Sequence, residues 1–134
     1  MSAITGIDRL RALGVEWDPA GVERILRIVL TLTTDGATDL LLVALFQPRD
    51  ASTTTWPSDD RGFIQLELHF AGVRDCAVKV DALPLSLRGF SVDDVASRGW
   101  EGIQLEVQDY ENGTISFICQ SMTIALPAEH GVDQ

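Results

Sequence analysis

His69 and Cys76 are the two side chains in this chain best suited to nucleophilic chemistry, and they lie seven positions apart. A thiolate can attack a substrate while a nearby imidazole takes up its proton. The alternation of the sequence argues against such a pair, because His69 lies on the polar face of its strand while Cys76 shares the apolar face with Val78. We therefore expect Cys76, and likewise Cys119, to be buried structural thiols.

Metal and cofactor chemistry has little support in the sequence. The two histidines, His69 and His130, are isolated, and no zinc-type spacing or calcium-binding loop occurs. The sequence has no glycine-rich phosphate loop and no nucleophile elbow. A disulfide between Cys76 and Cys119 would require neighbouring strands, and a cytosolic protein normally keeps such thiols reduced. We expect no metal, no cofactor and no enzymatic activity.

Negative charge is concentrated in the last third of the chain. The net charge is −10, and the stretch from Ser91 onward contains eight acids and a single base, Arg98. Nucleic acids bind cationic surfaces that replace their counterions, and anionic membranes attract basic segments. The charge therefore argues against a nucleic acid or a membrane surface as the partner. It leaves two interpretations, a solvated surface or a face that binds a basic protein.

The sequence offers candidate residues for a face that binds a basic protein. Trp56 lies in a polar loop where a large aromatic side chain is hard to bury, so it is a candidate hot spot. The acidic candidates lie around the last hairpin of the chain. The full predicted set of partner-binding residues is Trp56, Glu101, Glu106, Asp109, Tyr110 and Glu111.

Length and composition indicate one globular domain. The chain has 134 residues, of which 46% are hydrophobic, enough for a core of its own. The longest apolar run, 40–46, is too short to span a bilayer, and the first residues lack the pattern of a secretory signal. We expect the protein to be cytoplasmic. The preference for arginine, with nine Arg and one Lys, is compatible with a bacterial origin.

Hydrophobic periodicity predicts a mostly β (α+β) protein. An N-terminal helical segment (1–20) is followed by an antiparallel β region (22–127) and a tail (128–134). The expected architecture is an antiparallel β-sandwich or a strongly curled sheet of about eight strands, with a short N-terminal helix. Helical spacing and a capping-box pattern place that helix from about Gly6 to Leu13, with Gly14 as its stop. Asp18-Pro19 is suited to starting another helical turn.

The segment after the helix admits two interpretations. Residues 26–33 alternate with period two and are rich in β-branched residues, which favours a strand, and Asp35-Gly36 then marks a hairpin turn. A helix over Val22–Val29 is the competing interpretation. Residues 40–46 are apolar on both faces, as in a central strand.

The register of the last hairpin follows from its apolar residues. A two-residue turn at Asn112-Gly113 would place Val107 and Phe117 on opposite faces of the sheet. A three-residue loop ending at Gly113 instead pairs Val107 with Phe117 and Leu105 with Cys119. We therefore predict the three-residue loop, with Gly113 in the left-handed position.

Two stretches also carry a family resemblance. HFAGVRDCAVKV (69–80) and LRGFSVDDVASRGWEGIQLEVQDYENGTISFIC (87–119) contain the elements F-x-G-V, G-F and D-x-E-x-G-x-I-x-F. This pattern resembles small uncharacterised bacterial β-rich proteins of the toxin-immunity type, over about half of the chain. The resemblance implies an acidic protein that blocks a basic toxin nuclease by binding it directly. It assigns no individual functional residue.

Three functional hypotheses follow from the sequence. The first is a non-enzymatic acidic protein-binding module, such as an immunity protein neutralising a basic toxin. The second is a small-ligand binder or minor enzyme, with a pocket between sheet and helix near Trp17 and Trp100. The third is a homo-oligomeric subunit, a homodimer formed through an edge strand such as the one that ends the chain.

Overall fold

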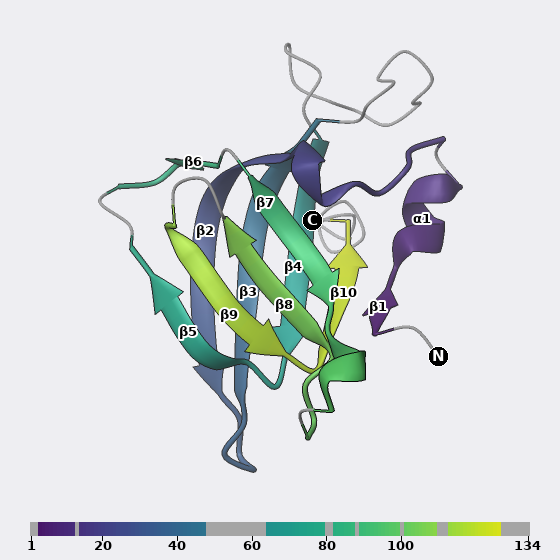
Figure 1. Ribbon diagram of the computed structural model, residues 1–134. Coiled ribbons are helices and arrows are strands. Elements are labelled where there is room, and N and C mark those ends of the chain that lie inside the picture. The colour runs from purple at the N-terminus through teal and green to yellow at the C-terminus, as the bar shows by residue number, and fades with distance from the viewer. Residues whose placement is uncertain are drawn as a thin grey trace.

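Two β-sheets packed face to face form the protein, as the computed structural model shows (Figure 1). The larger sheet has the strand order β1-β10-β4-β3-β2-β6, and the smaller sheet has the order β5-β9-β8-β7. The structure describes residues 3–12, 14–47, 64–79, 82–87, 89–99, 101–109 and 113–126. Every strand pair except β1 with β10 is antiparallel. The predicted class, a mostly β protein built as a sandwich with one short N-terminal helix, is confirmed.

Strands make up most of the described chain, and its helical elements are short. The strands are β1 (Ile4–Thr5), β2 (Val22–Leu32), β3 (Thr38–Phe46), β4 (Ile64–Ala71), β5 (Arg74–Val78), β6 (Leu85–Ser86), β7 (Phe90–Asp94), β8 (Leu105–Asp109), β9 (Ile115–Cys119) and β10 (Ser121–Ala125). The helical elements are the α-helix α1 (Ile7–Arg11) and the 3-10 helices η1 (Pro19–Gly21) and η3 (Ala96–Arg98). No helix among these is long and apolar enough to cross a membrane, in the part of the chain that the structure describes.

The core lies between the sheets and is built from alternate residues of each strand. Along β4, for example, Ile64, Leu66, Leu68 and Phe70 are at most 1% exposed. The rings of Phe70 and Phe117 meet edge to face across the two sheets, with centroids 4.9 Å apart. Burying each such side chain contributes about 1.5–3 kcal/mol. The alternation seen in the sequence is therefore what holds the layers together.

The ambiguous segment is a strand. β2 pairs antiparallel with β3 from Val22↔Phe46 to Leu32↔Thr38, with two bulges in its first half. The loop between them is closed by the Thr33 N–H, which donates to the Ala37 carbonyl oxygen over 2.8 Å. The Asp35 carboxylate accepts from the Thr33 hydroxyl and from the Ala37 N–H, and these bonds hold the pKa of Asp35 below its ordinary value. The predicted hairpin at Asp35-Gly36 is thus confirmed, and the competing helix is not formed.

The start of α1 differs from the sequence prediction. The capping box expected at Thr5 does not form, because Gly6 is the N-cap, with φ 93°, and no side chain caps the helix. Thr5 lies in β1, which pairs with β10 in parallel, and its hydroxyl contacts that of Thr123 at 3.0 Å. Tertiary strand pairing has therefore overridden a local capping preference.

The later helix signals are confirmed. Gly14 has φ 79°, and the Val15 N–H donates to the Leu10 carbonyl oxygen over 2.9 Å, as at a helix end closed by a left-handed glycine. The Asp18 carboxylate accepts from the Ala20 N–H over 3.1 Å, so Asp18 caps η1. These turns lead the chain from α1 into β2.

The strand that ends the described chain is not an edge. β10 lies between β4 and β1, so the homodimer expected through the chain's last strand would have to use another one. Two of the edge strands, β1 and β6, have only two residues each. The edge strand β5 is interrupted by a bulge at Asp75, which has φ 53°; it exposes Arg74, and the exposed Lys79 follows its last residue. Short length, bulges and exposed charge all oppose strand addition.

A glycine pair tests how the N-terminus is fixed. Gly6 and Gly36 both have left-handed backbone, but only at Gly6 would a Cβ collide with neighbouring backbone, at the Ile124 carbonyl oxygen. Gly36→Ala should cost about 1 kcal/mol of unfolding free energy, from the backbone conformation alone. Gly6→Ala should cost at least about 3 kcal/mol, because the collision adds to that strain. Urea unfolding of both variants checks this, and equal losses would contradict it.

Candidate functional site

The outer face of the smaller sheet carries a cluster of acids. In the pairing of β7 with β8, Asp93 lies directly opposite Glu106. Asp94 and Glu101 are exposed close by in the sequence, at the end of β7 and just before β8. We call the outward pair Asp93 and Glu106 the acidic face; Asp94 pairs with the buried Leu105, so its side chain leaves the other face of the sheet. The strands that carry it lie at the front of Figure 1.

The pairing of Asp93 with Glu106 is unfavourable by itself. Like charges directly opposite one another in adjacent strands repel. One cation offsets part of this repulsion, since Arg98 Nη1 lies 3.5 Å from Glu106 Oε1, with both side chains partly exposed. Asp94 has a local role as well, because its Oδ1 accepts from the Ala96 N–H at the start of η3. Asp93 forms no ion pair with any of the residues that the structure describes.

The strand register extends this cluster into a row across the whole sheet. Arg74 of β5 pairs with Ile118 of β9, Ile118 pairs with Glu106, and Glu106 pairs with Asp93. The row therefore runs from a base at one edge to two acids at the other, with a partly buried isoleucine between them. Such a row can bind a partner that has an apolar centre and basic groups on one side.

Not all of the predicted site residues lie on this face. Glu101 is exposed and Glu106 is partly exposed, as expected. Trp56, Tyr110 and Glu111, like Trp100, lie outside the described residues. Asp93 and Asp94 were not among the predicted site residues. They directly follow an apolar alternation, but only the pairing of their strand with β8 shows which acids they lie near.

Asp109 was wrongly predicted as a surface acid, because its side chain is fully buried. Its Oδ1 accepts from the Gly89 N–H over 2.9 Å, and its Oδ2 accepts from the Thr114 hydroxyl over 2.8 Å. Alternation explains the placement, since Asp109 shares the inner face of β8 with Leu105 and Val107. A buried carboxylate is tolerated only when it is hydrogen-bonded, and here it ties the starts of β7 and β9 to the end of β8.

The predicted register of the last hairpin is confirmed. Leu105 pairs with Cys119 and Val107 pairs with Phe117. Gly113 has φ 65°, the left-handed conformation expected of it, and its N–H donates to the Asp109 carbonyl oxygen over 2.7 Å. Glu106 consequently points outward beside Ile118, which places it on the acidic face.

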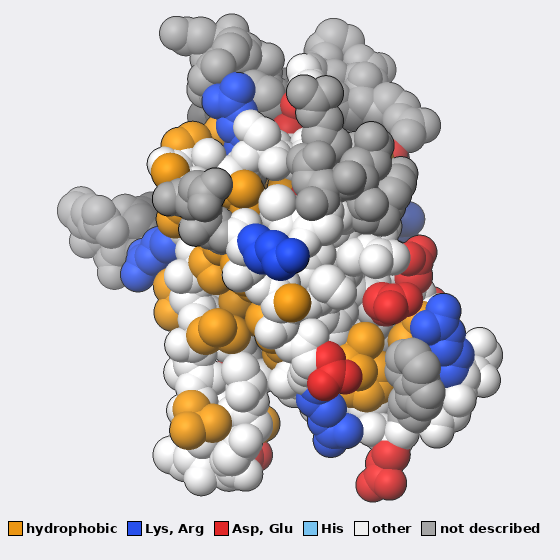
Figure 2. Space-filling view, turned by 60° about the vertical axis from the view of Figure 1, so that its left-hand side comes forward, with side chains coloured by type: hydrophobic (Ala, Val, Ile, Leu, Met, Phe, Trp, Pro, Cys, Tyr) orange, Lys and Arg blue, Asp and Glu red, His pale blue; other side chains and the backbone are white. Residues whose placement is uncertain are grey.

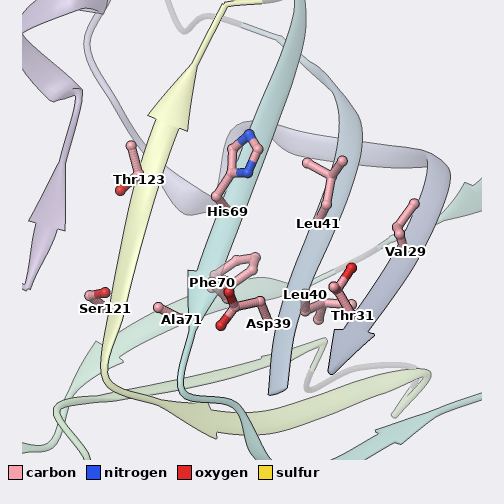
Figure 3. Close-up of a pocket in the computed structure, with 10 residues that line it drawn as sticks. All are labelled: Val29, Thr31, Asp39, Leu40, Leu41, His69, Phe70, Ala71, Ser121 and Thr123. Atoms are coloured by element: carbon pink, nitrogen blue, oxygen red, sulfur yellow. The ribbon is translucent and has the colours of Figure 1, made fainter. Parts of the chain in front are cut away.

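A second candidate lies on the outer face of the larger sheet. A shallow hollow of about 350 Å³ opens over β2, β3, β4 and β10. Figure 3 shows Val29, Leu41, His69 and Thr123 side by side from these four strands, and their pairing agrees. His69 is exposed, as predicted, and its Nε2 lies 3.2 Å from Glu67 Oε1.

The hollow brings one imidazole and several hydroxyl groups beside an apolar floor. No hydroxyl of the described residues hydrogen-bonds to His69, so no nucleophile is prepared for it there. The described part of the chain also has no group of three His, Cys, Asp or Glu placed to hold a metal ion. Near the predicted pocket, the Trp17 ring stacks on Phe46 with centroids 5.7 Å apart; Trp100, the other residue named for that pocket, lies outside the described residues.

The two thiols have different surroundings. Cys119 is buried as predicted, and burial raises the pKa of its thiol to about 12. Cys76 was predicted to be buried but is exposed, because the bulge at Asp75 breaks the alternation of β5 at the edge of the sheet. Partial burial nevertheless raises the pKa of Cys76. Both thiols are free, although β5 and β9 are neighbours.

Comparison with known proteins gives no relative from which to assign a function: no family model matches the chain, and neither curated proteins nor solved structures show significant similarity to it.

Removing the buried carboxylate of Asp109 should destabilise one end of the smaller sheet. Asp109→Ala leaves the Gly89 N–H and the Thr114 hydroxyl without their acceptor and should cost about 2–4 kcal/mol of unfolding free energy. Glu101→Ala, which truncates an exposed acid in the same region, should change it by less than about 0.5 kcal/mol. Urea unfolding followed by circular dichroism compares the two, and a small loss for Asp109→Ala would refute the role given to its side chain.

Thiol labelling should distinguish the two cysteines. In the folded protein at pH 8, a maleimide should modify Cys76 alone, since Cys119 is buried and its raised pKa leaves almost no thiolate. Labelling of Cys119 should require denaturant. Mass spectrometry of the Cys76→Ser variant provides the control, because that variant should remain unlabelled until it unfolds. Rapid labelling of the folded variant would contradict the placement of Cys119.

Proposed function

We propose that this protein is a non-enzymatic binding module whose acidic face contacts a basic partner protein. The observation that carries the proposal is the placement of Asp93 directly opposite Glu106 on an outward-facing pair of strands. Such a pair costs stability in the isolated protein. A basic side chain inserted between the two carboxylates would turn this repulsion into attraction.

The surroundings of that pair support protein binding. Ile118 lies beside Glu106 and is partly buried, so a partner can bury an apolar contact next to the charged ones. Arg74, at the other end of the row, would repel a uniformly basic surface at that point and so fix the orientation of the partner. Negative charge also speeds the encounter of a basic protein at low salt.

The partner class follows from charge and from the sequence resemblance together. The net charge of −10 favours a basic protein. Immunity proteins of the type that the sequence resembles block a basic toxin nuclease by direct binding. A toxin of this kind, met in the cytoplasm, is the partner that we propose first.

Binding of a small ligand in the hollow on the larger sheet is the alternative function. The apolar floor of the hollow at Val29 and Leu41 and its polar groups at His69 and Thr123 suit a small organic ligand with one hydrogen-bonding end. Thermal-shift screening tests this alternative. A shift that disappears in Leu41→Lys would support it, and a shift unaffected by that change would place the ligand elsewhere.

The main proposal predicts opposite effects of one substitution on stability and on binding. Asp93→Asn removes a repulsion, so the free energy of unfolding should rise by about 0.2–1 kcal/mol. The same change removes charge from the binding face, so the association rate with the partner should fall severalfold at low salt. Asp8→Asn, which removes an exposed acid from α1, is the matched control and should leave the association rate unchanged.

The partner for this measurement comes from capture at low salt. The wild-type protein serves as bait in a lysate of its native host, and retained proteins are released by raising the salt and identified by mass spectrometry. Stopped-flow association is then measured with the purified partner. If Asp93→Asn and Asp8→Asn slow association equally, or not at all, the acidic face is not the binding surface.

A further inference from the structure

β2 presents an uncovered edge along its second half. On the side away from β3, its neighbour β6 pairs only with Arg24 and Ile25. From Arg27 to Leu32, no strand among the described residues pairs with this edge. Figure 2 turns the left-hand side of Figure 1 forward, and its left part shows hydrophobic side chains together with a few Lys and Arg side chains, while most acids lie at the lower right.

The backbone of this edge is prepared for another strand. The Thr33 N–H donates to the Ala37 carbonyl oxygen, so Thr33 and Ala37 are a hydrogen-bonded pair. Hydrogen-bonded and non-hydrogen-bonded pairs alternate along an antiparallel ladder, and the register with β3 is regular here. Val29 and Thr31 therefore direct their N–H and C=O groups toward β3. Leu30 and Leu32 direct theirs toward the open edge.

The side chains of the same two residues are exposed. Leu30 is 55% exposed and Leu32 is 75% exposed, and both project from the same side of β2. Most edges in the described part of the fold are protected by short length, a bulge or charge, as described above for β1, β5 and β6. A regular edge with exposed leucines is therefore an exception, and such edges add strands.

We propose that a second copy of this chain pairs with β2 antiparallel, about a two-fold axis beside Thr31. Leu30 of one copy then lies opposite Leu32 of the other. Because both residues direct their backbone groups outward, each pair can exchange both of its hydrogen bonds. The two larger sheets become one continuous sheet. The interface is isologous, since each copy offers the same surface.

Charge supports a second copy as the occupant. Antiparallel pairing about Thr31 brings Arg27 of one copy beside the turn that contains Asp35 of the other, and it does so at both ends of the interface. Arg27 and Asp35 are both exposed in the single chain. The β2 edge is therefore complementary to itself in charge as well as in its apolar centre.

Salt separates this proposal from the proposed function, on which it does not rest. Each copy carries a net charge of −10, so two copies repel one another over long range. Salt screens that repulsion, and dimerisation should strengthen as ionic strength rises. Binding of a basic partner at the acidic face should weaken under the same change. Either proposal can therefore fail without the other.

Sedimentation equilibrium of the full chain tests the dimer. At concentrations up to about the high micromolar range, the wild-type protein should dimerise, with tighter association at 0.5 M than at 0.05 M salt, on either side of the ionic strength where the Debye length is about 10 Å. Leu30→Thr combined with Leu32→Thr should weaken association at least about tenfold, since it removes the apolar contact and keeps β propensity. Leu83→Thr is the matched control, because Leu83 is exposed but lies outside β2, and it should leave association unchanged.

A backbone variant guards against a false interpretation of these results. Leu30→Pro removes an N–H that faces the open edge, so the ladder with β3 should persist while dimerisation is lost. Circular dichroism confirms that the variant is folded. A monomeric wild-type protein under all of these conditions, a dimer that survives in Leu30→Pro, or a loss of dimer in Leu83→Thr would each overturn the proposal.

Discussion

The buried carboxylate of Asp109 is the contact on which the smaller sheet depends. It is the only polar or charged residue among the fully buried described positions, and it joins segments that are distant in sequence, through Gly89 before β7 and Thr114 before β9. A desolvated charge is costly unless its bonds are satisfied, so only one arrangement of these segments is acceptable. Strand register at that end of the sheet is thereby fixed, and with it the outward position of Glu106.

The alternation of β8 places the residues that build the core on one face and the residues that meet solvent on the other. Its inner residues, Leu105, Val107 and Asp109, hold the sandwich together, while Glu106 and Gln108 point to solvent. A change of one position in the strand register would exchange these roles. The like-charged pair that we place at the centre of binding therefore exists only because the interior is strictly specified.

Sequence reasoning succeeded where local pattern and tertiary structure agree. The hairpin between Leu105 and Cys119 could be registered because both strands carry clear apolar alternation and Gly113 marks the turn. The same reasoning failed at Cys76, where a bulge shifted the phase of the strand, and at Thr5, where pairing with β10 replaced a helix cap. The sequence pattern could not predict which strands lie next to each other in the sheets. The meeting of Asp93 with Glu106 and the open edge of β2 both depend on which strands pair, and no short-range pattern encodes that.

The place of β10 has a consequence for how the protein is made. β10 is inserted between β4 and β1, so β1 has no partner strand until β10 has been made. During synthesis, β1 can pair only after residues 121–125 have left the ribosome. Until then, the edge of β4 on the side away from β3 lacks the strand that covers it in the folded protein. Closure of the larger sheet therefore requires residues 121–125 to be synthesised, although both strands that flank them in the sheet precede them in the sequence.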